Sequence, residues 1–433
     1  MPGERYVVLG LAHPRSTWFR DLARWSTSGL VPLEFLKCVT AQELTARLRT
    51  GRALSAVLLD GGTAGTDRDV VAEARDHGCV AIVVDDGRTG RDWYALGANA
   101  VLPTGFGPAD LLAVLDAHAS MIGRAVQPAT AHVVSSARPA GRLLAVCSSG
   151  AAGATTIAMA LAQGFGASRQ SSGSVLLADF ALDADMAVLH DVGDVIPSVR
   201  ELVDAHRGGT PPDSDVRSYC FEMVDRDYFL LLGLRRHREW TTLRPRAFDA
   251  ALATLRQQFT VVVADVATDL EGEAQCGSID VEERNHLART TTAQADLVVT
   301  VGRPGVKGAH RLVRLIGALS EHGVDRSRIL PVINCAPRGR AHRAELASTV
   351  IGFTRGEPNQ APANQPAFVP ELRRIDDLTR DGERLPVAFV ATIVDHVSTV
   401  LEQLEPTALE DALEPVPVQR GSLGTWFDDA ADS

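Results

Sequence analysis

Short apolar segments that alternate with helical stretches are the feature of this sequence that most restricts its fold. Within residues 1–122 the apolar segments lie at 6–12, 32–40, 53–61, 79–86 and 98–103. The stretches at 41–51 and 108–118 have the spacing of amphipathic helices. Short, uniformly apolar strands separated by helices are typical of a parallel sheet with helices on both faces. The first part of the chain is therefore predicted to be a doubly wound α/β domain.

A second α/β series follows and predicts a larger domain with a mostly parallel sheet. Its apolar segments lie at 142–149, 174–180, 228–234, 259–266, 295–302 and 329–336. Helical stretches occur at 156–165, 245–258 and 308–323, and a final strand and helix end the series. Residues 123–140 lose this periodicity and are rich in Ser, Ala, Pro and Gly. We therefore expect domains at 1–122 and 141–403, a linker at 123–140, and a disordered acidic tail at 404–433.

Composition and charge restrict the classes of protein, and of binding partner, with which the sequence is compatible. Apolar residues make up 45% of the 433 residues and charged residues 22%, as in ordinary globular domains. The net charge of −11 disfavours nonspecific binding to nucleic acid, which needs a clustered basic surface. No apolar run approaches the roughly 18–20 residues that span a bilayer, and the N-terminus lacks a signal-peptide cleavage site. We therefore expect a cytoplasmic protein without a membrane helix or a nucleic-acid partner.

A glycine-containing turn between a strand and a helix is the clearest candidate site. The strand at 142–149 runs into the sequence SGAAGATT, residues 149–156, where the next helix begins. Glycines at such a turn let backbone N–H groups approach an anion, which the helix dipole also attracts. Thr155 or Thr156 would supply a hydroxyl group for Mg²⁺. Taken alone, the segment fits a glycine turn that binds nothing equally well.

The turn resembles KGGxGKTT, the deviant Walker A motif of the MinD/ParA family of ATPases. Four positions match the motif, namely Gly150, Gly153, Thr155 and Thr156. Ser149 and Ala154 stand at the two lysine positions. Ala151 replaces the second glycine, and Ala152 stands at the variable position. The resemblance implies ATP and Mg²⁺ as cofactors, with residues 150–156 around the nucleotide and Thr155 as a metal ligand.

Acidic and amide side chains at later strand ends extend the same resemblance. VLLADFALDADMAVL is similar to the family segment VLLVDLDLQFGD, which implies Asp179 and Asp183 as catalytic carboxylates if the site is active. VVVADVATDL is similar to the Walker B segment VVVDLPP, which places Asp265 beside the metal with Asp179. In PVINCAP, Asn334 matches the asparagine that family members hold against the adenine. These four residues occur in the order and at the spacing of the family.

Loss of both lysines from the motif bears on activity. Of the 43 lysine and arginine residues only Lys37 and Lys307 are lysines, and both lie outside the motif. A charged hydrogen bond contributes about 1.5–3 kcal/mol, so nucleotide affinity would fall roughly ten- to a hundredfold. Loss of one hydrogen-bond donor to the charge that develops in the transition state lowers the rate of a reaction by about 10²–10³. We therefore expect weak binding of ATP and Mg²⁺ with little hydrolysis, and whether the chain is an enzyme stays open.

The N-terminal series resembles a response-regulator receiver domain. Asp60 ends the third strand at the phosphoacceptor position, and ALGANAVLPTGFGPADLLAVL is similar to the last strand and helix of a receiver. Receivers also have an acidic pair after the first strand and a lysine after the fifth. Here those positions read GLAHPR and Thr104. The resemblance therefore implies a vestigial phosphoacceptor in an atypical receiver that serves for dimerisation or docking.

A receiver-like domain ahead of a MinD-like domain is the arrangement of the CpaE/TadZ proteins of Flp/Tad pilus assembly, and of their actinobacterial septum-site-determining relatives. This resemblance implies a localisation or regulatory protein, a homodimer, that is recruited to a pole or septum. Its partners would be a secretion or pilus ATPase or the division machinery, with membrane association only through them. An active ATPase that switches between dimer and monomer is one alternative. A ParA-type DNA-partitioning protein is another, which the acidic charge and the lack of a helix-turn-helix region disfavour.

Overall fold

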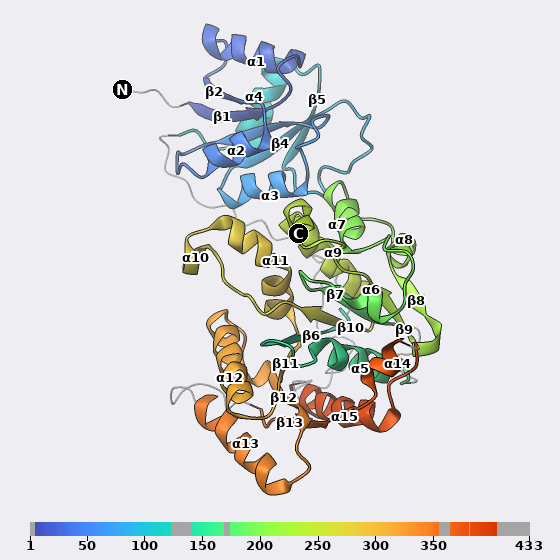
Figure 1. Ribbon diagram of the computed structural model, residues 1–433. Helices are drawn as coiled ribbons and strands as arrows, with labels where there is room; N and C mark the ends of the chain where they lie inside the picture. Colours follow the sequence, from blue (N-terminus) through green and yellow to red (C-terminus); the bar gives the residue numbers. More distant parts are fainter. Residues whose placement is uncertain (1–4, 123–139, 169–173, 355–363, 381, 405–433) are drawn as a thin grey trace, which may run out of the picture.

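The computed structural model describes residues 5–122, 140–168, 174–354, 364–380 and 382–404. They form two α/β units with mostly parallel sheets, which confirms the predicted fold class (Figure 1). The predicted linker at 123–140, apart from its last residue, lies outside the described residues. The same holds for the acidic tail at 404–433, apart from its first residue.

The N-terminal unit is a five-stranded sheet whose strands are all parallel. Its strands, in spatial order, are β2 (Leu33–Cys38), β1 (Tyr6–Leu11), β3 (Ala56–Asp60), β4 (Val80–Asp85) and β5 (Ala100–Pro103). Two helices cover each face of the sheet. One face packs on α1 (Thr17–Ser28) and α4 (Pro108–His118), and the other on α2 (Ala41–Leu48) and α3 (Arg68–Asp76). This is a doubly wound order, which brings the carboxyl ends of β1 and β3 together.

The C-terminal unit has an eight-stranded sheet in which only the edge strand β8 is antiparallel. In spatial order its strands are β13 (Ala367–Pro370), β12 (Ile329–Ala336), β11 (Leu297–Gly302), β6 (Arg142–Ser148), β10 (Val261–Val266), β7 (Val175–Phe180), β9 (Tyr228–Leu231) and β8 (Phe221–Met223). The first strand of this unit in chain order, β6, lies at the centre between β11 and β10. Ligands of open α/β sheets bind beyond the carboxyl ends of the strands where the order reverses. That crevice lies at the end of β6.

Helices bury both faces of this sheet. One apolar core forms against α7 (Val199–Arg207), α9 (Pro245–Gln258), α11 (Ile279–Gln294), α12 (Val306–Glu321) and α13 (Arg340–Thr354). The other forms against α5 (Ala154–Gly166) and α15 (Val387–Leu404). Shorter helices lie in the connections: α6 (Met186–Leu189), α8 (Asp213–Val216), α10 (Glu273–Cys276) and α14 (Ile375–Arg380). The strands are apolar along their length because both faces are covered.

Helix α15 bears on the expectation that no apolar run approaches the length of a membrane span. By length and composition alone its 18 residues could cross a membrane, but a core helix passes the same test. Its buried side packs on α5, where a Cβ atom on Gly164 would lie 2.4 Å from Val394 Cγ2. Only glycine permits so close an approach of two helices. Six apolar residues of α15 lie in the core of the C-terminal unit, namely Phe389, Val390, Ile393, Val397, Val400 and Leu401.

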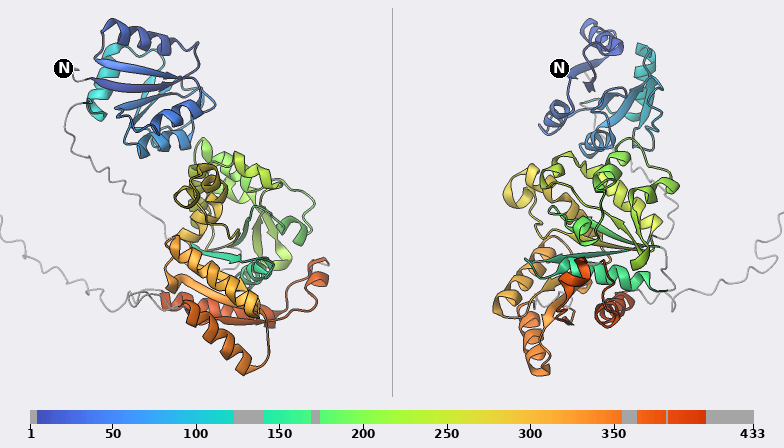
Figure 2. Two further views of the ribbon diagram at one scale, coloured as in Figure 1. Left: turned by 60° about the vertical axis from the view of Figure 1, so that its left-hand side comes forward. Right: turned by 45° about the vertical axis from the view of Figure 1, so that its right-hand side comes forward.

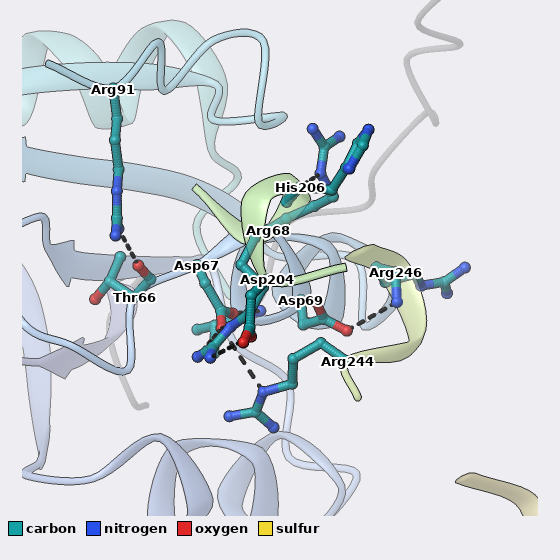
Figure 3. A network of polar contacts seen from close by, with 11 residues as sticks. Thr66, Asp67, Arg68, Asp69, Arg91, Asp204, His206, Arg244 and Arg246 are labelled. Atoms are coloured by element: carbon teal, nitrogen blue, oxygen red, sulfur yellow. Dashed lines mark hydrogen bonds and ion pairs between the residues drawn. The ribbon is translucent and has the colours of Figure 1, made fainter. Parts of the chain in front are cut away.

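Helix α3 connects the two units, which lie end to end (Figure 2). Asp67, the N-cap residue of α3, is 2% exposed and accepts a hydrogen bond from Arg207 Nη2 at 3.0 Å (Figure 3). Arg244 Nε lies 3.7 Å from the same carboxylate oxygen. Arg68 donates to the backbone oxygen of His206 at 3.0 Å. A buried carboxylate needs cations and hydrogen bonds around it, so the start of α3 depends on residues of the second unit.

Two further carboxylates of α3 face the start of α9. Asp69 accepts a hydrogen bond from the Arg246 amide at 2.8 Å, and burial raises the pKa of its carboxyl group to about 6. The Arg246 guanidinium also pairs with Asp76 at the other end of α3. Polar contacts to the second unit therefore hold both ends of α3, and Figure 3 shows those at its start.

Candidate phosphate-binding site

The turn between β6 and α5 has the backbone that its glycines predict. Gly150 and Gly153 both have positive φ angles, 94° and 89°, which glycine adopts without strain. Gly153 is also the N-cap residue of α5. A Cβ atom on Gly153 would lie 2.6 Å from Asn334 Nδ2, which leaves no room for a larger residue. Both matches to the glycine positions of the motif therefore have a conformational cause.

Backbone N–H groups of this turn are free to bind an anion. Among the described residues, no acceptor is found for the amides of five residues, namely Ala151, Gly153, Ala154, Thr155 and Thr156. The turn is instead closed by a bond of 2.6 Å from the Ala152 amide to the Gly150 oxygen. Free amides at a helix N-terminus, together with the helix dipole, attract phosphate oxygens. The geometry fits a phosphate group.

A hydroxyl group and two carboxylates lie beyond this turn. Thr155 Oγ1 donates a hydrogen bond of 2.6 Å to Asp265 Oδ2, which joins α5 to the end of β10. Asp265 is paired in register with Asp179 on the neighbouring strand β7. Thr156 follows on the first turn of α5 and is half-buried. The structure thus brings together the three residues that the sequence predicts around Mg²⁺.

Burial raises the pKa of both carboxyl groups above the usual range of an aspartate. Burial and the charge of Asp265 raise the pKa of Asp179 to about 8, against two backbone N–H bonds that lower it. Burial raises the pKa of Asp265 to about 6, against the bond from Thr155. The charge of Asp185, just before α6, contributes to both shifts, and sequence analysis did not single this residue out. A divalent cation would favour the charged forms instead.

The residues present fit a metal ion only together with a phosphate ligand. No group of three or more His, Cys, Asp or Glu suited to a metal occurs in the described part of the chain. Mg²⁺ takes six oxygens, and it commonly uses one or two carboxylates plus phosphate oxygens and water. Thr155 and Asp265 would be the nearest protein oxygens to an ion held by a nucleotide in the turn.

Asn334 supports the turn from the end of β12. Its Nδ2 donates to the Ala152 oxygen at 2.8 Å, and its Oδ1 accepts from the Cys335 amide at 2.8 Å. The side chain is buried, at 8% exposure. In this structure its hydrogen bonds therefore go to the phosphate turn and to its own strand, whereas the sequence resemblance implies a contact with adenine.

The two lysine positions of the motif differ in their surroundings. Ser149 Oγ is buried and has no hydrogen-bond partner in the described part of the chain. Ala154 opens α5, and its methyl group is 8% exposed. Neither residue supplies charge to the turn. The Ser149 hydroxyl is thus a buried polar group at the start of the turn without a partner among the described residues.

Asp183 lies apart from the other predicted site residues. Its side chain is 87% exposed and contacts His237 Nδ1 at 2.9 Å. The structure therefore groups Asp179 with Asp265 and leaves Asp183 at the surface of the following loop.

The predicted phosphoacceptor of the N-terminal unit has its oxygens already engaged. Asp60 Oδ2 accepts hydrogen bonds from Ser16 Oγ at 2.8 Å and from Trp18 Nε1 at 3.1 Å. Its Oδ1 accepts from the Gly62 amide at 3.0 Å. The exposed Thr104 stands where a receiver has its lysine. Neutral donors thus surround a carboxylate that, in a working receiver, would face a metal and a phosphoryl group.

Acetyl phosphate with Mg²⁺ should leave Asp60 unmodified, because its oxygens are hydrogen-bonded and the described residues place no lysine or metal-binding cluster beside it. Intact-mass spectrometry of the full chain tests this, with Asp60→Asn as the matched control. A mass increase of one phosphoryl group in the wild type that is missing in Asp60→Asn would overturn the prediction.

A glycine turn with free amides, at the switch point of a parallel sheet, defines the chain as an α/β protein with a phosphate-loop geometry.

No family model and no curated protein matches this chain. A plasmid partition protein from Borrelia burgdorferi, solved with AMPPNP, is 13% identical with a TM-score of 0.45, over 61% of this chain and 99% of that chain. A ParA family ATPase from Chlorobium tepidum is 14% identical with a TM-score of 0.46, over 61% and 99%. The septum site-determining protein MinD from Pyrococcus horikoshii, complexed with Mg-ADP, is 15% identical with a TM-score of 0.42, over 62% and 97%.

Proposed function

We propose that this chain is a MinD/ParA-type localisation or regulatory protein that binds ATP with Mg²⁺ weakly and hydrolyses it little. The observation that supports this most directly is the phosphate turn itself. Five backbone amides have no partner there among the described residues, and Thr155 is hydrogen-bonded to Asp265 at the adjacent strand end. Unpaired amides occur at any helix N-terminus, so the support comes from their position beside a hydroxyl group and a buried acid.

The geometry supports a role for each of these residues. The amides of the turn would orient the phosphates, and Thr155 with Asp265 would hold the metal side of the site. When bound, Mg²⁺ supplies the positive charge that neutralises the phosphate oxygens. Ser149 and Ala154 supply none, so the chain's own residues stabilise little of the charge that develops during hydrolysis. Binding without efficient turnover is the expected result.

Weak hydrolysis favours a role in which nucleotide binding, and not turnover, distinguishes one state of the protein from another. We propose a homodimer of the CpaE/TadZ type in the cytoplasm that is recruited to a pole or septum. A secretion or pilus ATPase or the division machinery would be its partner, and the receiver-like unit would present a docking surface. An active ATPase that switches between dimer and monomer is the alternative, and the intact Thr155–Asp265 pair favours it. DNA partitioning remains disfavoured by the net charge of −11.

Wild-type protein should bind a fluorescent ATP analogue with Mg²⁺ at micromolar to millimolar affinity and release phosphate barely above background. Thr155→Ala should weaken the Mg²⁺-dependent part of this binding by about tenfold or more, because it removes the hydroxyl group beside the metal. Thr399→Ala, an exposed threonine of α15, is the matched control and should bind like wild type. No binding at millimolar nucleotide would exclude the proposal. Rapid turnover that Asp265→Ala abolishes would favour the active ATPase instead.

A further inference from the structure

An arginine of α12 lies against the phosphate turn, far from it in sequence. Strand β11 pairs with β6 in a register that sets Val301 beside Ser148, one residue before the turn begins. Helix α12 follows β11 after a short connection and packs beside it (Figure 1). A Cβ atom built on Gly150 would lie 3.0 Å from Arg311 Nη1. The guanidinium group is therefore next to the backbone of the turn.

Arg311 differs from several other arginines of the C-terminal unit, each of which contacts a partner within the protein. Arg207 is paired with Asp67, Arg256 with Asp296, and Arg303 contacts Cys335 Sγ at 3.3 Å. For Arg311, no carboxylate or carbonyl partner occurs among the described residues, and its side chain is exposed. A guanidinium group with free donors beside free backbone amides is suited to a phosphate oxygen, which it can bind in a bidentate manner.

The turn also lacks the charge that Arg311 could supply. Both lysine positions hold uncharged residues, and the Ser149 hydroxyl is buried without a partner. We infer that Arg311 acts as the cation of this site and binds the terminal phosphate of a nucleoside triphosphate held in the turn. This inference rests on the proposed function, because it assigns a residue to the same nucleotide site. It predicts discrimination between nucleotides, which the amides alone would not give.

Discrimination between ATP and ADP follows from the position of the Arg311 guanidinium group. Arg311 approaches Gly150, at the start of the turn, whereas the amides nearest α5 are those of Gly153 to Thr155. The guanidinium therefore lies against the start of the turn. A nucleoside triphosphate carries more negative charge than a diphosphate, so it gains more from a cation at this position. Arg311 should thus strengthen binding of ATP more than binding of ADP.

Titrations of the full chain with fluorescent ATP and ADP analogues, with Mg²⁺, test this inference. Arg311→Ala should weaken ATP binding about tenfold or more and ADP binding by less. Arg311→Lys keeps the charge without the planar fork and should fall between wild type and Arg311→Ala. Arg314→Ala is the matched control, because Arg314 is exposed on the same helix with no contact to the turn in the described structure. Its affinities should equal those of wild type.

The outcomes separate this inference from the proposed function. Wild-type binding that Arg311→Ala leaves unchanged would overturn the role of Arg311 and leave nucleotide binding in place. Equal loss of ATP and ADP affinity in Arg311→Ala would overturn the assignment to the terminal phosphate. A wild type that binds neither nucleotide would overturn both proposals. Thermal unfolding of each variant shows that the fold is intact, as expected for a substitution at an exposed position.

Discussion

Ala154→Lys should tighten binding of ATP with Mg²⁺ by roughly ten- to a hundredfold, since a hydrogen bond to a charged group contributes about 1.5–3 kcal/mol. Ala154 is the first residue of α5, and its own amide is one of the five that have no acceptor among the described residues. A lysine side chain that starts there can fold back over the turn toward phosphates held by those amides. Calorimetry of wild type and variant with ATP and Mg²⁺ measures the gain.

Two controls show whether the gain in affinity depends on the position of the new charge and whether it is accompanied by faster hydrolysis. Ala341→Lys adds the same charge at an exposed position of α13 and should leave the affinity unchanged. Phosphate release by Ala154→Lys should stay slow, because Ser149 still lacks the second lysine of the motif. Binding that is no tighter in Ala154→Lys than in Ala341→Lys would contradict the assignment of this turn to nucleotide phosphates.

The strands and the phosphate turn could be predicted because their signals are local. A strand covered on both faces is apolar along its length, so the segments at 174–180 and 259–266 correspond closely to β7 and β10. Helix α11 could not be found in the same way. Its buried positions include Asn285, Thr291 and Thr292, so it lacks the apolar stripe that marks an amphipathic helix. Polar packing of this kind is visible only once its neighbours are known.

Contacts between distant segments account for what the sequence did not show of the site. Thr155 and Asp265 could be placed together because parallel strands end at one edge of a sheet. The bond from Asn334 to the Ala152 oxygen, and the position of Arg311 beside the turn, depend on how β12 and α12 pack around β6. The same holds for the buried Asp67 between the two units. No spacing within one segment encodes these contacts.

Asp179→Asn should make the stability of the nucleotide-free protein much less dependent on pH. The folded-state pKa of Asp179 is about 8, and that of an unfolded aspartate is about 3.9. A carboxyl group whose pKa is raised on folding binds more protons in the folded state. Its contribution to stability is therefore greatest at low pH and is lost as pH rises from the unfolded pKa to the folded pKa. Wild type should lose stability between pH 5 and pH 8.

The slope of stability against pH is the decisive measurement, because the substitution also has a constant effect. Asp179 accepts hydrogen bonds from the Ala181 and Met186 amides, and an asparagine can keep only one of them. That loss lowers the stability of the variant equally at each pH. Relative to wild type, Asp179→Asn should nevertheless gain roughly 2–4 kcal/mol in the free energy of unfolding from pH 5 to pH 8. Urea unfolding at each pH with a chelator present gives this difference.

A matched substitution separates burial from the loss of one negative charge. Asp395→Asn on the exposed side of α15 removes the same charge from a solvated position, so its pH profile should follow that of wild type. Parallel profiles for Asp179→Asn and wild type would mean that Asp179 is ionised at little cost in the folded protein. The negative charge of the buried pair Asp179 and Asp265 would then have to be compensated by a group other than a proton. If the profiles diverge as expected, the proton on Asp179 occupies the place where a cation held by phosphate would later bind.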